Sequence, residues 1–351
     1  MAKILVIADI TPSSGLGHWM RCYNLAHSLA DEDVVVHALK SPFMQTCNFF
    51  MPTEFIQWHC TNIDLNDTDI VKLVEILNEA HQFSAVLIDG YEYSTSYRSE
   101  LRKVGVPVIA YDDINNSPEY HCDLLINSNA HAENLNYSAS APEAKVLLGP
   151  QYRHFAKAYY LANGHLMTES NWHERTSLTI VMGGNDIHSL TLPLLQTLLD
   201  LDWTDKLPSI QVITTEMHAN LSMIHQWCEE YSNITVHHQE YDLSAVFTST
   251  RLAISGAGGT AYELQMCATP AMLINLADNQ NATAKEATRM GWAESWNWQD
   301  NADITELAKQ IHSQWLDEQT LRNMHNKLLH DQKQFATVKL KSEIMSFLED
   351  R

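Results

Sequence analysis

The chain has few basic residues and no long apolar run. Its 351 residues include 22 lysines and arginines against 43 aspartates and glutamates, and the formal net charge is -21 at pH 7. Such a surface repels nucleic acid and anionic membranes, so we expect neither as a partner. No segment approaches the roughly 20 apolar residues that a spanning helix needs. The N-terminal stretch MAKILVIADI also lacks the cleavage site of a signal peptide. We therefore expect a soluble cytoplasmic protein without membrane insertion.

Several cofactor and metal motifs are missing as well. The six cysteines are scattered with no C-x-x-C pair, which indicates reduced thiols. No Gly-Lys-Ser/Thr step is present, which excludes a Walker-type nucleoside triphosphatase. Asp112 and Asp113 are adjacent carboxylates, but neighbouring side chains diverge and other ligands do not cluster around them in the sequence. We expect them to act structurally or through hydrogen bonds, and we expect no metal or other cofactor.

Short apolar runs separated by polar or glycine-containing turns recur in both halves of the chain. They lie at 3–8, 34–38, 85–88, 106–111 and 123–127, and again at 178–182, 210–214, 234–238, 252–255 and 271–276. Helical periodicity lies between several of them, as at 69–80, 190–201 and 219–230. This alternation predicts an α/β fold with a doubly wound parallel sheet in each half.

Two domains are expected at this length. Apolar periodicity lapses in the polar stretch Asn163–Thr176, which places a first Rossmann-like domain at 1–165 and a second at 166–351. The tail Ile304–Leu348 is helical in pattern and is expected to close the second sheet.

The first predicted strand runs into a glycine-rich turn that carries Gly15, Gly17, His18 and Arg21. Glycines after a strand let the backbone approach a ligand closely, and the following helix offers its N-terminus. His18 would lie in the first turn of that helix, where the helix dipole disfavours imidazolium; a neutral imidazole suits a general base. Because the third glycine of G-x-G-x-x-G is replaced by Met20, the dinucleotide-binding alternative is weak. With 18 histidines present, a structural role for His18 is the competing interpretation.

Two further turns follow predicted strands. Asp89 and Tyr91 end the strand at 85–88, at the edge where ligands gather in open α/β sheets. Asp89 would orient a partner and Tyr91 would bond substrate or water. Gly183, Gly184 and Asp186 follow the first strand of the second half, where backbone can approach a phosphate or sugar. A plain turn is the alternative for both segments.

The second half also contains the richest glycine loop. It comprises Ser255, Gly256, Gly258, Gly259 and Thr260, with Glu263 one turn into the next helix. Its amides can hold a diphosphate without a lysine, and Glu263 can accept both ribose hydroxyls. Asn279 and Gln280 follow the next predicted strand.

In order and spacing these motifs resemble the GT-B architecture and, more narrowly, the UDP-sugar hydrolases of pseudaminic acid biosynthesis, which act on UDP-2,4-diacetamido-2,4,6-trideoxy-β-L-altropyranose. The resemblance covers most of the chain. It rests on G-x-G-H-x-x-R-C at 15–22, I-D-x-Y at 88–91, Y-D-D at 111–113, H-C-D-L-L-I-N-x-N-A at 121–130, L-L-G-P-x-Y at 147–152, M-G-G-x-D at 182–186 and the G-G-T-x-Y-E-L…P…N-Q block at 258–280.

The resemblance implies two Rossmann-like domains facing a cleft, and it implies roles for particular residues. His18 is implied as the base for a water that attacks the anomeric carbon and expels UDP with inversion. Tyr91 and Asn279 are implied in the active site, and Gly258, Gly259, Thr260 and Glu263 around the nucleotide. The implied partners are a UDP-sugar substrate and the product UDP, with no metal required.

One segment departs from the family pattern. The family usually has an arginine four residues after the tyrosine of L-L-G-P-x-Y and a phenylalanine beyond it, whereas this chain has Ala156 and Tyr159. Arg153 or Lys157 would have to substitute. A glycosyltransferase on the same fold and a non-catalytic UDP-sugar-binding homologue therefore stay open beside the hydrolase.

Overall fold

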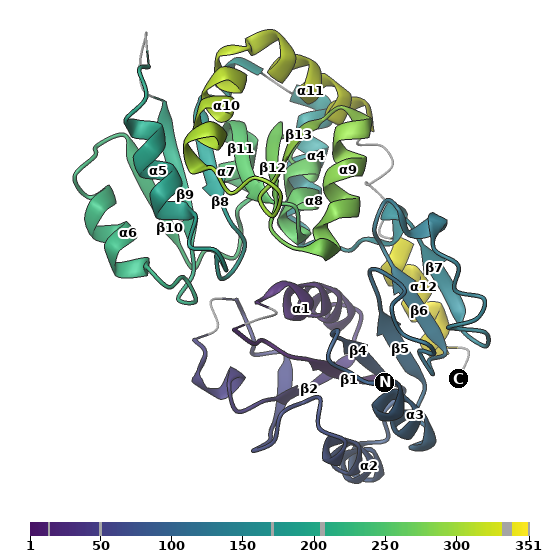
Figure 1. The fold of residues 1–351 in the computed structure, drawn as a ribbon. Helices are drawn as coiled ribbons and strands as arrows, with labels where there is room; N and C mark the ends of the chain where they lie inside the picture. Colours follow the sequence, from purple (N-terminus) through teal and green to yellow (C-terminus); the bar gives the residue numbers. More distant parts are fainter. Residues whose placement is uncertain (13–14, 49–50, 170–171, 204–207, 332–338, 350–351) are drawn as a thin grey trace. The chain divides into compact units, whose positions relative to one another are not determined.

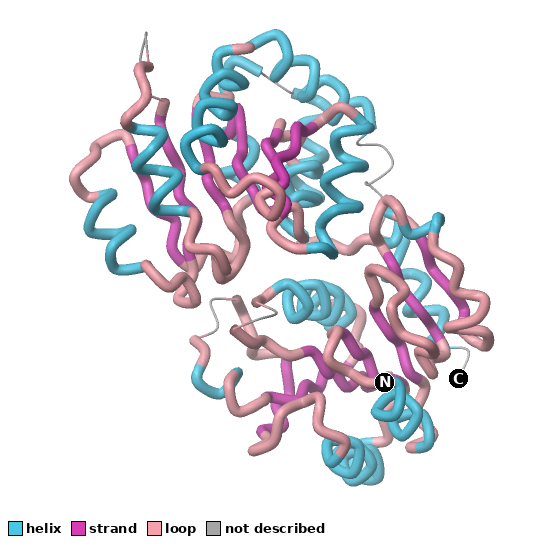
Figure 2. The backbone as a smooth tube through the Cα atoms, viewed as in Figure 1, coloured by secondary structure: helices cyan, strands magenta, loops and turns pink. Residues whose placement is uncertain are grey.

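The structure is a computed structural model that describes residues 1–12, 15–48, 51–169, 172–203, 208–331 and 339–349. It contains two compact units, one formed by Met1–Phe155 with Thr337–Arg351 and the other by Ala156–Ala336. In each unit helices flank a parallel sheet (Figures 1 and 2). Among the described residues no helix is both long and apolar enough to span a membrane.

The first unit is built on a seven-stranded sheet in the order β3-β2-β1-β4-β5-β6-β7. Every pairing is parallel, and the strands are β1 Lys3–Ala8, β2 Val35–Lys40, β3 Ile56–Cys60, β4 Ala85–Asp89, β5 Val108–Tyr111, β6 Leu124–Asn127 and β7 Lys145–Leu148. Its α-helices are α1 Gly17–Ala30, α2 Asp69–His81, α3 Thr95–Lys103 and α12 Lys339–Glu349, with short 3-10 helices at Met44–Thr46, Ala132–Asn134 and Pro150–Tyr152. The central strands β1, β4, β5 and β6 are buried along nearly their whole length, as apolar runs in a doubly covered sheet must be.

The second unit is built on a six-stranded parallel sheet in the order β10-β9-β8-β11-β12-β13. Its strands are β8 Ser177–Val181, β9 Ser209–Thr214, β10 Ile234–His238, β11 Thr250–Gly256, β12 Ala271–Asn275 and β13 Ala293–Asn297. Its helices are α4 Lys157–Glu169, α5 Thr191–Leu199, α6 Leu221–Cys228, α7 Ser244–Ser249, α8 Gly259–Met266, α9 Asn281–Met290, α10 Ile304–Leu316 and α11 Glu318–Asp331, with 3-10 helices at Trp172–Glu174 and Asp278–Gln280.

Both sheets reverse their strand order once. The reversal lies between β1 and β4 in the first unit and between β8 and β11 in the second. At such a switch point the loops that leave two neighbouring strands run to opposite faces and open a crevice at the carboxyl ends. The candidate residues after β1, β4, β8 and β11 therefore stand where α/β sheets bind ligands.

The predicted α/β architecture is confirmed, and each of the ten apolar runs forms a strand. The domain boundary differs. The first half of the polar stretch Asn163–Thr176, up to Glu169, belongs to α4, which packs within the second unit against α7 and α8. Asn163 is buried and donates from Nδ2 to the Met266 carbonyl at 3.3 Å. The division thus falls after Phe155 rather than after His165, because tertiary contacts make a helix of a segment whose composition is typical of a linker.

The end of the chain also differs from the expected arrangement, since α12 joins the first unit instead of the second. Its buried side chains are Leu340, Ile344, Phe347 and Leu348. Two ion pairs at 2.6 Å fasten it, Lys145 with Glu343 and Lys341 with Glu32. The helical periodicity of the tail predicts a helix but does not identify the sheet against which that helix packs.

Candidate functional site

At the switch point of the first sheet, His18 lies beside Asp89. His18 is the second residue of α1, and Asp89 is the last residue of β4. His18 Nδ1 lies 2.8 Å from Asp89 Oδ1, and the carboxylate is 1% exposed. Because a carboxylate only accepts, Nδ1 carries the proton and Nε2 keeps its lone pair. No described residue forms a hydrogen bond with Nε2.

Arg21, one turn further along α1, joins two carboxylates. Its Nη2 donates to Asp89 Oδ1 at 2.6 Å, and its Nε also pairs with Asp89. Its Nη1 donates to Asp113 Oδ1 at 2.7 Å. The positions follow from helix geometry, because residues three apart on α1 lie on one face and reach the same sheet edge. Two negative charges and one positive charge thus surround His18.

Asp113 collects further donors from neighbouring loops. The Tyr91 hydroxyl donates to its Oδ2 at 2.6 Å, and Asn129 Nδ2 donates to its Oδ1 at 2.7 Å. Arg153 extends the network by donating from Nη2 to Asn129 Oδ1 at 2.9 Å. The Tyr91 ring stands edge-on to His18, with centroids 4.6 Å apart, and is 38% exposed. Tyr91 is therefore the member of this network that faces solvent most.

The charges of this network shift the pKa of His18 upward. Burial disfavours imidazolium, but the Asp89 carboxylate beside the ring outweighs that cost and raises the pKa above 6.5. For Asp89 itself burial favours the protonated form, yet the Arg21 guanidinium and then His18 hold the pKa of the carboxyl below its usual value. Arg21 likewise holds the pKa of Asp113 far below its usual value against the effect of burial.

This corrects the expectation that the helix dipole keeps His18 neutral. The sequence contains the helix start but does not reveal that a carboxylate lies within hydrogen-bond distance. A unit charge at 2.8 Å outweighs the half charge attributed to a helix end. His18 is thus a stronger base than a free histidine, as in the Asp–His pairs of hydrolytic enzymes.

Asp112 has hydrogen-bond partners different from those of Asp113, since its Oδ2 accepts from the Tyr137 hydroxyl at 2.5 Å and from the Asn115 amide at 2.7 Å. The hydrogen-bonding roles expected for Asp112 and Asp113 agree with these contacts. Within the described part of the chain, the one group of three or more potential metal ligands with closely spaced ligand atoms lies elsewhere, at His37, His59 and His81.

In the second unit, the two predicted glycine loops meet at the switch point between β8 and β11. Gly183 adopts a left-handed conformation with φ 83°, which accounts for a glycine there. Gly259 opens α8 with an ordinary φ, and a side chain built on it would meet no atom within 4 Å. The same holds for Gly17 at the start of α1. Among the described residues, neither backbone strain nor a neighbouring atom accounts for glycine at these two helix starts.

Helix α8 begins with amides that no described side chain caps. The N-terminal N–H groups of a helix lack partners within the helix, so they are available to an anion. Ser255 lies behind this loop, fully buried, with its hydroxyl on the Gly256 carbonyl at 3.0 Å. Thr260 and Glu263 follow on α8, both partly exposed. The loop shape agrees with an anion site, whereas Ser255 has its hydroxyl turned to the backbone.

Asp186 has a structural position. It is 3% exposed, and its two carboxylate oxygens accept the amides of Leu190 at 2.9 Å and Thr191 at 2.8 Å. Both oxygens therefore hold the start of α5, and Asp186 shapes the loop that carries Gly183 and Gly184.

Asn279 and Gln280 lie on the 3-10 helix after β12, next to the glycine loop. Asn279 is exposed. Gln280 Oε1 accepts the Leu276 amide at 3.0 Å, and its Nε2 lies 3.9 Å from the position of a Cβ on Gly258. The β11 and β12 loops thus lie side by side in the second unit.

Two known proteins are similar to this chain in sequence over most of its length. No protein-family model matches the chain. A UDP-2,4-diacetamido-2,4,6-trideoxy-beta-L-altropyranose hydrolase from Campylobacter jejuni is 22% identical over 292 residues, which cover 83% of this chain and 97% of that protein. The uncharacterized protein MJ1062 from Methanocaldococcus jannaschii is 21% identical over 78% of this chain and 55% of its own length.

Solved structures agree over the full chain. MurG from Acinetobacter baumannii superimposes with a TM-score of 0.63 at 15% identity, covering all of both chains. The spinosyn rhamnosyltransferase SpnG has a TM-score of 0.63 at 13% identity over 99% of this chain and all of its own. Anabaena Alr3699/HepE in complex with UDP and glucose has a TM-score of 0.60 at 13% identity, covering all of both chains. The fold is therefore of the GT-B type, with two Rossmann-like domains.

Asn129 is not among the predicted site residues, although the motif H-C-D-L-L-I-N-x-N-A contains it, and Arg153 is predicted only as a substitute for a missing cation. Arg153 connects to Asp113 through Asn129. By contrast, Lys157 is exposed on α4 of the second unit, and Tyr159 is buried there with its ring 6.5 Å from that of Phe247. Of the two cations weighed as substitutes in this segment, Arg153 is the one joined to the His18 network.

Proposed function

We propose that this protein hydrolyses a UDP-sugar, with His18 as the general base. The observation that carries the proposal is the His18–Asp89 pair at the switch point of the first sheet, with Nε2 left without a partner among the described residues. A protonated Nδ1 on a buried carboxylate gives Nε2 both a fixed orientation and a raised basicity.

In the proposed reaction, Nε2 of His18 takes a proton from water as the water oxygen bonds to the anomeric carbon. The bond between that carbon and the diphosphate oxygen breaks, and its electron pair leaves with UDP. Attack opposite the leaving group inverts the configuration. Tyr91, partly exposed beside the His18 ring, would bond the sugar or the water.

The second unit would hold the nucleotide. The uncapped start of α8 and the open space at Gly259 suit the diphosphate, and Glu263 suits the ribose hydroxyls. Asn279, exposed after β12, would contact the substrate beside that loop. The similarity to the Campylobacter jejuni hydrolase, though only 22% identical, supports hydrolysis and a UDP-2,4-diacetamido-2,4,6-trideoxyhexose as the substrate.

A glycosyltransferase is the second candidate, since a solved structure with the same fold is named a rhamnosyltransferase. In that case an acceptor hydroxyl would replace water at His18. Incubation with UDP-sugars in the absence of acceptor distinguishes the two. Equal amounts of UDP and free sugar support hydrolysis, UDP release only when an acceptor is added supports transfer, and tight UDP binding without turnover contradicts both.

A further inference from the structure

Three histidines of the first unit converge on the face of the sheet opposite α1. His37 lies on β2, His59 on β3, and His81 is the last residue of α2. Trp58 stacks on Trp19 of α1 with centroids 5.3 Å apart. Because successive strand residues point to opposite faces, His59 points away from α1. The cluster is therefore separated by the sheet from the His18 network.

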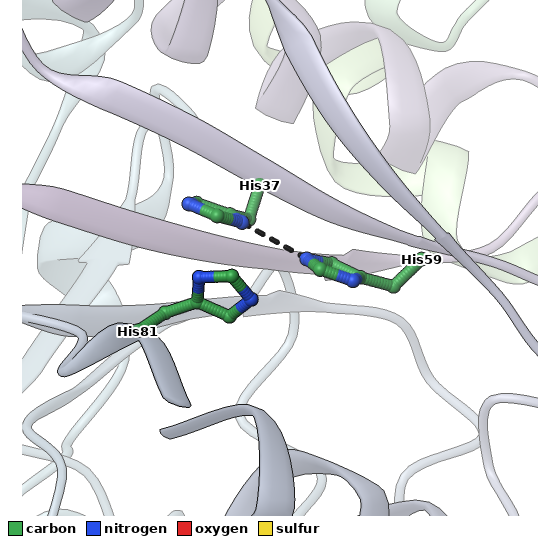
Figure 3. A group of neighbouring side chains, drawn as sticks. All are labelled: His37, His59 and His81. Atoms are coloured by element: carbon green, nitrogen blue, oxygen red, sulfur yellow. Dashed lines mark hydrogen bonds between the residues drawn. The ribbon is translucent and has the colours of Figure 1, made fainter. Parts of the chain in front are cut away.

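The register of β2 and β3 brings the first two histidines together. His37 pairs with Gln57 and Leu39 with His59, so the two histidines lie diagonally on one face of adjacent strands. Their rings are stacked at 4° with centroids 5.2 Å apart, and Nδ1 of His37 lies 2.9 Å from Nε2 of His59. Figure 3 shows the third ring, that of His81, turned toward the other two. One nitrogen from each ring lies within 4.8 Å of the others.

We propose that the three-histidine cluster of His37, His59 and His81 binds Zn²⁺, with water completing the coordination. Imidazole nitrogen is a preferred ligand of zinc, and three histidines with one open position form a known type of zinc site. Two nitrogens on one zinc, each at about 2.0–2.1 Å, lie roughly 2.9–3.4 Å apart. The His37–His59 spacing of 2.9 Å already fits. His81, half-buried at a helix end, completes the site through a side-chain shift of about 1.5 Å or less.

The protonation state suits a metal. Burial, followed by the neighbouring His81, His59 and Lys3, lowers the pKa of His37 to about 4, and burial with His81 lowers that of His59. Zinc binds the neutral form of imidazole, so these two histidines need not release a proton from an imidazolium before they bind the metal. A change of tautomer moves the proton of the His37–His59 hydrogen bond to the far side of its ring and frees both facing nitrogens.

Two neighbouring groups act in opposite directions. Lys3 donates from Nζ to the His81 carbonyl at 2.7 Å, and its positive charge opposes a divalent cation. The carboxyl end of α2 carries a partial negative charge that favours one. A bound ion would join two strands, including the edge strand β3, to the end of a helix. We therefore expect zinc to stabilise the first unit.

The test uses the full chain without a histidine tag, after treatment with a chelator. Zn²⁺ titration by calorimetry and Co²⁺ absorption are measured for the native protein, His59→Gln, His81→Gln and the control His225→Gln. The control removes one ring of the His225–His238 pair, whose ring centroids lie 5.3 Å apart. Among the described residues this pair belongs to no group of three possible metal ligands. Thermal unfolding without metal shows whether each variant folds.

We expect one Zn²⁺ per chain with micromolar affinity, a higher melting temperature with zinc, and Co²⁺ bands typical of a site with four or five ligands. His59→Gln and His81→Gln should each weaken zinc binding by more than about tenfold, because loss of a ligand costs at least as much as loss of a group that hydrogen-bonds to a ligand. His225→Gln should leave zinc binding unchanged. The proposal is overturned if zinc binds only at millimolar concentration, or if the three variants weaken binding equally. UDP-sugar turnover is not part of the readout, so this result is independent of the proposed function.

Discussion

Asp89 Oδ1 lies 2.8 Å from His18 Nδ1, and this contact joins the end of β4 to the start of α1. It determines which nitrogen of the ring is basic, and together with Arg21 it determines how basic that nitrogen is. The two motifs that contain these residues are far apart in the sequence, and this contact brings them together at one edge of the sheet.

Substitution of His18 should greatly slow turnover while leaving nucleotide binding intact. Loss of a general base costs about 10²–10⁴-fold in rate, whereas the proposed nucleotide contacts lie in the second unit. We expect kcat of His18→Ala to fall by that factor, with UDP affinity by calorimetry within about twofold of the native value. His27→Gln, a half-buried histidine further along α1, is the control and should retain activity. Parallel loss of UDP affinity in His18→Ala would contradict the assigned role.

The pH dependence of the reaction should reflect the raised pKa of His18. A base acts only when deprotonated, so kcat/KM should fall as the pH drops through the pKa of His18, which Asp89 places above 6.5. The acid limb of the profile should thus lie at higher pH than for an ordinary histidine. Product release measured from pH 5 to 9 tests this.

Asp89→Asn should displace that acid limb and lower its plateau. Without the carboxylate, burial lowers the pKa of His18 and the limb moves to lower pH. The amide can also donate to Nδ1, which places the ring proton on Nε2 and removes the base, so we expect a plateau lower by about 10²–10⁴-fold. Glu100→Gln removes a surface carboxylate from α3 and should change neither quantity. An unshifted limb in Asp89→Asn would indicate that another group titrates.

Tyr91→Phe separates the hydroxyl from the ring. It removes the 2.6 Å hydrogen bond to Asp113 but keeps the ring that stands edge-on to His18. Because this side chain is partly exposed, we expect the free energy of unfolding to change by less than about 1 kcal/mol. A role toward substrate or water predicts that kcat/KM falls about tenfold or more. Unchanged kinetics with lowered stability would reduce Tyr91 to a structural residue.

The fold is largely predictable from the sequence because its central strands are buried on both sides. Each of the ten predicted apolar runs between Lys3 and Leu276 forms a strand. The missed strands are β3, β7 and β13, all at or near a sheet edge. Their residues IQWHC, KVLL and AESWN are mostly half-buried or exposed and include polar side chains, so none of these segments is a continuous apolar run.

The candidate site is predictable in its residues but only partly in its contacts. The glycine turns and the ends of β1 and β4 identify His18 and Asp89, because parallel strands place their carboxyl ends together. The spacing of residues does not predict the directions of their side chains. It therefore does not predict that Arg21 joins Asp89 to Asp113, or that both oxygens of Asp186 bind the start of a helix. His37, His59 and His81 show the same limit, since three distant positions come together only through strand register.

Glu263 should govern affinity for the ribose of the nucleotide. It lies one turn into α8, partly exposed, where a carboxylate can accept two hydroxyl donors. Hydrogen bonds to a charged group contribute about 1.5–3 kcal/mol, so Glu263→Gln should weaken UDP binding roughly tenfold to a hundredfold. The control Glu229→Gln alters an exposed glutamate at the end of α6 in the same unit and should bind normally.

A comparison of UDP with 2′-deoxy-UDP makes this prediction specific. If Glu263 accepts the 2′-hydroxyl, the native protein should bind UDP about tenfold more tightly than 2′-deoxy-UDP. Glu263→Gln should lose most of that preference, because the variant lacks the carboxylate that the 2′-hydroxyl would contact. A preference that survives in the variant would move the ribose contact to another residue. An equal loss for both nucleotides would instead point to a general effect on the α8 loop, whose open amides we assign to the diphosphate.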